Sequence, residues 1–73
     1  SRNLWETFEI KLRNHKDEAV EVAVLENLYR MANWKIENVS HSWDKENSNR
    51  IRFDVNVPSE GETVITYTAH YTW

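Results

Sequence analysis

The chain has 73 residues, no cysteine and a net charge of −3, from nine Lys and Arg against twelve Asp and Glu. This length allows one small domain. The scattered basic residues argue against nucleic acid as a partner, and the apolar runs fall far short of the roughly 20 residues needed for membrane insertion. Without disulfides, stability must come from burial, and the four Trp, three Tyr and two Phe are the main core material.

The first predicted strand covers residues 5–14. Its apolar side chains Phe8, Ile10 and Leu12 alternate with charged ones, a period of two that is typical of a half-buried strand with a charged outer face. The polar residues 14–18 then favour a turn, because Asn and Asp side chains bond readily to nearby backbone.

The second predicted strand begins at Val20, and valines recur at every second position as far as Val24. We expect it to pair with the first strand across a short hairpin loop. The path of residues 25–33 is open, because Val20, Val24 and Leu28 also share one face of a helix. A strand through about Leu28 is favoured, since β-branched residues at period two are poor helix formers.

The middle of the chain alternates again from residue 34 to residue 39, which predicts a third strand. Residues 41–49 are predicted to be a polar loop that holds one large ring, Trp43. Residues 51–57 form a fourth strand, which Pro58 ends.

The final predicted strand, residues 64–73, is nearly all β-branched or aromatic. Gly61, the only glycine, precedes it in a turn where positive φ is most needed. Hydroxyls and the imidazole of His70 occupy one face of this strand. The other face carries the apolar residues Ile65, Tyr67, Ala69, Tyr71 and Trp73.

Strands at this spacing, joined by polar turns, predict an all-β fold. We expect a small antiparallel immunoglobulin-like β-sandwich of about five to seven strands, with a partly open barrel as the alternative. Residues 1–73 are predicted to be a single β-sandwich module. Because the chain begins abruptly and ends inside a strand, we expect it to be the C-terminal fragment of a larger protein.

Several segments carry a resemblance to a known family: Asn-His-Lys-Asp-Glu-Ala-Val at 14–20, Trp-Lys-Ile at 34–36, Ser-His at 40–41, Ile-Arg-Phe at 51–53, Val-Pro at 57–58 and Thr-Tyr-Thr at 66–68. On these the chain resembles the carboxy-terminal part of DUF4139, a bacterial domain of unknown function. The resemblance implies a β-sandwich whose partners are other domains of the parent protein. The resemblance favours a parent protein that is secreted or in the cell envelope over a cytoplasmic one. It supplies no catalytic residues.

The three histidines, His15, His41 and His70, raise the question of a metal site. They lack the spacing of zinc ligands, so we expect surface or sheet-face residues instead. Residues 44–49 begin like a calcium loop but have Asn49 where that loop needs Gly, so we expect a solvated polar loop. No metal or cofactor is predicted.

Paired carboxylates are the remaining candidates for chemistry. Glu6 with Glu9, and Glu60 with Glu62, lie on a predicted outer face or turn, where nothing would shift a pKa. We therefore expect that the protein is not an enzyme, and a hydrolase is the weakest of the functions considered.

Trp43 and Tyr29 are the candidate contacts for a ligand or partner, because a ring in a polar loop can stack on a sugar or peptide. For Trp43 a role in capping the core is favoured. Whether its ring is exposed is not decided by the sequence. Residues 38–40 match a glycosylation sequon, which we discount within a predicted strand.

The sequence thus predicts a non-catalytic structural or protein-interaction module of a larger bacterial protein. The alternative is a carbohydrate- or peptide-binding module that uses loop aromatics or an edge strand.

Overall fold

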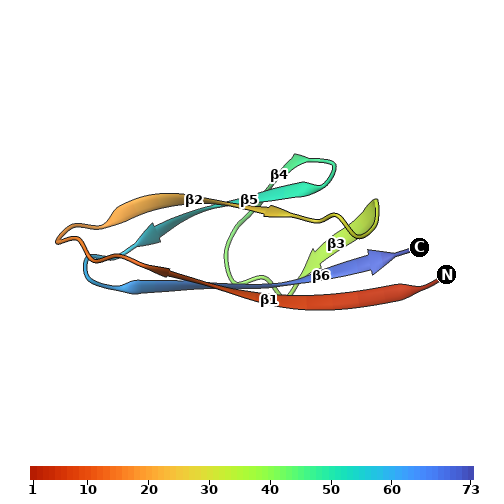
Figure 1. Cartoon of the computed structure of the whole chain (residues 1–73), viewed down its shortest axis with the longest axis horizontal. Helices are drawn as coiled ribbons and strands as arrows, with labels where there is room; N and C mark the ends of the chain where they lie inside the picture. The colour runs from red at the N-terminus through yellow and green to blue at the C-terminus, as the bar shows by residue number, and fades with distance from the viewer.

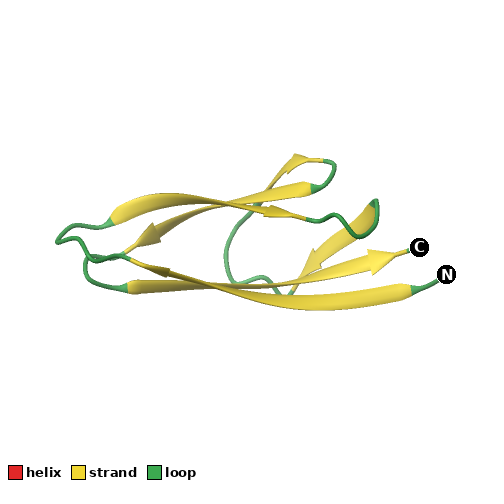
Figure 2. Ribbon diagram, viewed as in Figure 1, coloured by secondary structure: helices red, strands yellow, loops and turns green.

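The computed structural model of the protein describes residues 1–73. The chain forms six strands and no helix (Figure 2). The strands are β1 (Asn3–Arg13), β2 (Val20–Asn27), β3 (Asn33–Glu37), β4 (Asp44–Asn47), β5 (Arg50–Val57) and β6 (Glu62–Thr72).

Two three-stranded antiparallel sheets, with orders β1-β6-β3 and β2-β5-β4, pack face to face (Figure 1). The molecule is long and narrow, 50 × 20 × 16 Å. The central strands β5 and β6 supply most of the core, because only a central strand is covered on both edges. The buried apolar cluster comprises Leu28, Ile51, Phe53, Val55, Ile65, Tyr67, Ala69 and Tyr71, and Val57 is also buried at the end of β5. The predicted all-β sandwich is confirmed.

The expected hairpin between the first two strands is wrong. β1 pairs with β6 along its whole length, whereas β2 pairs with β5 in the other sheet. The intervening segment therefore crosses from one sheet to the other. The expectation failed because a short polar loop between two alternating strands suits a hairpin and a sheet-to-sheet crossing equally well.

Asn14 holds this crossing segment in place. It is buried, and its side-chain amide lies 2.8 Å from the carbonyl of Glu18 and 3.2 Å from those of Val57 and Pro58. Its Oδ1 accepts a hydrogen bond from the Lys16 amide at 2.9 Å, which closes the predicted local turn. One side chain thus ties the β1–β2 crossing to the end of β5.

The third strand is shorter than expected, and the polar loop is not all loop. β3 ends at Glu37, because Asn38 adopts a left-handed conformation with φ 50°. Within the expected loop, β4 pairs with β5 through a bulge. All four of its residues are exposed, so it has no apolar alternation for a sequence pattern to detect. The open stretch after Val24 resolves as strand to Asn27, not helix.

The turn before the last strand differs from the expectation in one respect. Positive φ falls on Glu60 (48°), not on Gly61. Gly61 is required for space instead, since a Cβ there would lie 2.7 Å from Cγ of Pro58. At the other end, Trp73 lies just beyond β6 and is 46% exposed, so it is not the core residue that the alternation predicted.

Candidate functional site

The sandwich has four free strand edges, and they differ in how well they are protected. β4 has four residues and a bulge, and β3 has only five residues. β1 has eleven residues and β2 has eight, and neither contains a proline or a register shift. Short or bulged edges resist pairing with another chain, whereas long regular edges offer a template for it. The side of the sandwich formed by β1 and β2 is therefore the candidate interaction site.

The hydrogen-bond pattern shows which backbone groups of β1 are free. Arg2 and Trp73 exchange two backbone hydrogen bonds, of 2.6 and 3.0 Å. Bonded pairs alternate along an antiparallel ladder, so the even-numbered residues of β1 bond to β6. The N–H and C=O groups of the odd-numbered residues from Asn3 to Arg13 point away from β6. They form an uninterrupted row of unpaired donors and acceptors.

The outer face of the same sheet carries an aromatic pair on β1 and β6. Trp5 stacks on His70, directly opposite, with ring centroids 4.3 Å apart and an interplanar angle of 18°. Both ring nitrogens of His70 lie 2.8 Å from an oxygen, of Glu37 on one side and Asn3 on the other. Trp5 is 55% exposed, although one face of its indole is covered by the His70 ring. Thr68, two residues before His70 on the same face of β6, is buried and hydrogen-bonded to the Thr7 hydroxyl at 2.8 Å.

Two glutamates point inward from the long edge strands. Glu6 lies on the core face of β1 and accepts a 2.7 Å hydrogen bond from Arg30 in the β2–β3 loop. Glu26 lies on the core face of β2 and accepts a 2.8 Å hydrogen bond from the hydroxyl of Tyr67. The expected outer-face position of Glu6 is thus wrong. Glu6 lies two residues before Phe8, so the alternation in the sequence already placed both side chains on the same face of the strand.

These inward carboxylates change the electrostatics of the core. Burial, and then the hydrogen bond to Glu26, hold the pKa of Tyr67 well above its ordinary value. Burial, and then the negative charge of Glu6, raise the pKa of Tyr71. Inward charges on edge strands also discourage indiscriminate strand pairing. Each carboxylate already has a partner, so neither is a free acid or base.

Trp43 caps the core. It is only partly exposed, packs against the core cluster, and its ring lies 6.4 Å from that of Trp34. Trp34 is itself fixed, because its indole N–H donates a 3.0 Å hydrogen bond to the carbonyl of Ser48. A shallow hollow beside Trp43 is lined by residues 39–43.

Tyr29 lies elsewhere, in the β2–β3 loop, and is 72% exposed. It lines a different hollow together with Leu28 and Met31. The structure therefore does not bring the two predicted contact residues, Trp43 and Tyr29, into one site.

The histidines are dispersed in the same way. His15 is exposed in the β1–β2 crossing, His41 bonds to the Ser40 hydroxyl at 2.7 Å, and His70 lies on the outer face. No group of three His, Asp or Glu side chains is arranged to hold a metal ion. The segment that resembles a calcium loop contains β4 and its turn, where Asn47 accepts a 3.0 Å hydrogen bond from the Asn49 amide.

Comparison with known proteins found no matching family model, no matching curated protein and no matching solved structure. Membership of DUF4139 therefore stays a prediction. The structure contains no helix of the length and apolar character needed to cross a membrane.

Proposed function

We propose that this chain is a non-catalytic β-sandwich module that acts through protein contacts, as a structural or interaction part of a larger bacterial protein. The observation that carries the proposal is the free edge of β1, where every second residue of an eleven-residue regular strand presents unpaired backbone groups. Main-chain pairing with an added strand is a common way for such an edge to bind protein.

The side chains along this edge support binding rather than chemistry. Glu9, Lys11 and Arg13 on its outer face are solvent-exposed. Glu9 and Lys11 lie 3.5 Å apart, and Arg13 lies 3.7 Å from Glu62. Exposed charges of this kind contribute little to folding, but they select partners and register.

The test is a titration of the chain, at a concentration where it is monomeric, followed by amide chemical shifts. The probes are alternating Val-Thr peptides of either net charge and soluble cello-, chito- and malto-oligosaccharides. A peptide that pairs with the edge should shift the odd-numbered amides of β1 and leave those of β3 and β4 unchanged. The proposal fails if no peptide moves the β1 amides and these amides also stay unchanged as the concentration of the chain is raised.

A glycan-binding module is the second candidate, and the exposed indole of Trp5 favours it. Trp5 is 55% exposed and stacks on His70, so it offers exposed aromatic surface to a sugar, whereas Trp43 packs on the core. In the same titration, a sugar that quenches tryptophan fluorescence in the native chain but not in Trp5→Ala would establish this alternative instead.

A further inference from the structure

We propose that the partner of the β1 edge is a second copy of this chain, with the two β1 strands antiparallel and Ile10 opposite Ile10 of the other copy. This inference rests on the proposed function and names the partner. The two copies would form one continuous six-stranded sheet about a two-fold axis. An interface of this kind presents the same surface from both copies, so that surface must be complementary to itself.

The outer face of β1 meets that requirement in this register. Glu9 of each copy lies opposite Lys11 of the other, and the backbone groups of both residues point outward, so the pair can form hydrogen bonds. Because Glu9 and Lys11 already lie 3.5 Å apart within one chain, each charge would sit between two opposite charges. Thr7 would lie opposite Arg13. No like charges lie directly opposite one another.

Each neighbouring register places one pair of like charges opposite one another. A shift of two residues in one direction places Glu9 opposite Glu9. A shift in the other direction pairs Glu9 with Arg13 but places Lys11 opposite Lys11. Like charges directly opposite on paired strands are destabilising. The charge order of β1 therefore selects one register over its two nearest competitors.

The inner face of β1 is complementary in the same register. Phe8 of each copy would lie opposite Leu12 of the other, on either side of the Ile10 pair. All three side chains are only partly buried in the single chain, although they belong to the core-facing row. Pairing would cover this row from the open side. Glu6, the one charged member of the row, would lie beyond Phe8, opposite Asn14.

The experiment is sedimentation velocity on the whole chain, from micromolar to millimolar concentration, with charge-reversed variants. The native chain should show a monomer–dimer equilibrium. Glu9→Lys and Lys11→Glu should each weaken it at least about tenfold, because each places like charges opposite one another. The double variant should recover dimerisation, and an equimolar mixture of the two single variants should form a heterodimer. Lys35→Glu, on the outer face of β3, is the matched control and should dimerise like the native chain.

The register has its own test, since the native chain has no cysteine. Ile10→Cys should cross-link to itself on mild oxidation more readily than Glu9→Cys or Lys11→Cys, which would face themselves only in the shifted registers. A native chain that stays monomeric throughout, or dimers that neither single reversal weakens, would overturn the inference. Peptide-induced shifts at β1 in a monomeric chain would leave the proposed function standing without it.

Discussion

The hydroxyl of Tyr67, on the central strand of one sheet, donates a 2.8 Å hydrogen bond to the carboxylate of Glu26, on an edge strand of the other sheet. The bond joins the two layers at the β2 side of the core. Tyr67 is almost fully buried, and its ring also packs on Phe8 and Phe53, with centroids 5.1 and 5.7 Å away. The polar contact therefore lies within the aromatic part of the core.

Removing the Tyr67 hydroxyl should weaken the fold. We expect Tyr67→Phe to lower the free energy of unfolding by about 1 to 2 kcal/mol, because Glu26 loses a partly buried donor. Urea denaturation measures this, and Tyr29→Phe, whose hydroxyl is exposed, is the control. In a double-mutant cycle with Glu26→Gln the two changes should be non-additive. Equal losses in Tyr67→Phe and Tyr29→Phe would contradict the prediction.

Alkaline pH should also destabilise the domain. The folded state raises the pKa of Tyr67 and Tyr71 above the value of about 10 for a free tyrosine. The unfolded chain then loses these protons first, so stability is complete below about pH 10 and falls as the pH rises beyond it. Urea midpoints measured across this range should fall, and fall less steeply in Tyr67→Phe. A flat profile would contradict the prediction.

Asn14 should be among the most sensitive polar positions. We expect Asn14→Ala to cost about 3 kcal/mol, because the buried carbonyl of Val57 and the partly buried carbonyls of Glu18 and Pro58 lose their donor. Asn14→Asp keeps the acceptor for the Lys16 amide but loses the donor, so it should also destabilise. His15 is exposed and adjacent to Asn14, so His15→Ala is the control and should change the thermal midpoint little.

Two substitutions in the turn between β5 and β6 should change the stability of the fold in opposite directions. Gly61→Ala should destabilise by about 1 to 3 kcal/mol through overpacking against the Pro58 ring. Much of that loss should disappear in a Pro58→Ala background, where Cγ is absent. Glu60→Gly should stabilise or be neutral, because Glu60 has a φ of 48°. Calorimetry on the four variants tests the assignment, and a stabilising Gly61→Ala would refute it.

Trp43 and Tyr29 should separate a core role from a surface role. We expect Trp43→Ala to cost about 2 kcal/mol or more, since its ring packs against the core cluster and lies beside Trp34. Tyr29→Ala should stay within about 0.5 kcal/mol of the native chain. Thermal denaturation distinguishes the two, and a neutral Trp43→Ala would mean that the ring does not cap the core.

Much of the fold was predictable from the sequence because alternation reports burial directly. β1, β5 and most of β6 carry their apolar residues at period two, and the structure turns those faces toward the core, fully buried in β5 and β6 and partly buried in β1. Strand pairing was not predictable, because alternation says nothing about which edge a strand meets. The exposed β4 has no apolar residue at all, so a pattern based on burial could not detect it.

The candidate site was harder to predict for a related reason. An edge is defined by the absence of a neighbouring strand, which depends on the order of strands and not on the composition of any one of them. Trp43 drew attention as a ring in a polar loop, yet the structure packs it on the core. Trp5, near the start of a well-marked strand, shares the outer face with Glu9 and Lys11, so the alternation already indicated that its indole would be exposed.

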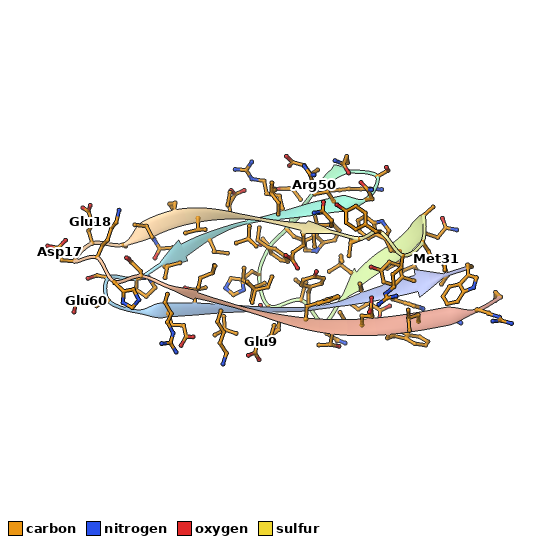
Figure 3. The ribbon with its side chains drawn as sticks, viewed as in Figure 1. Glu9, Asp17, Glu18, Met31, Arg50 and Glu60 are labelled. Carbon is orange, nitrogen blue, oxygen red and sulfur yellow. The ribbon has the colours of Figure 1, made fainter.

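The pairing of Arg2 with Trp73 has a mechanical consequence. Because β1 and β6 are antiparallel, both ends of the chain meet at the same end of one ladder (Figure 1), opposite the end where Glu60, Asp17 and Glu18 lie (Figure 3). A force applied between Arg2 and Trp73 would load the hydrogen bonds of the β1–β6 ladder one after another, from that pair toward Arg13 and Glu62 at its other end. The sheet would unzip at low force instead of resisting in shear, so tension between the ends would expose the β1 strand and its inward-facing residues first.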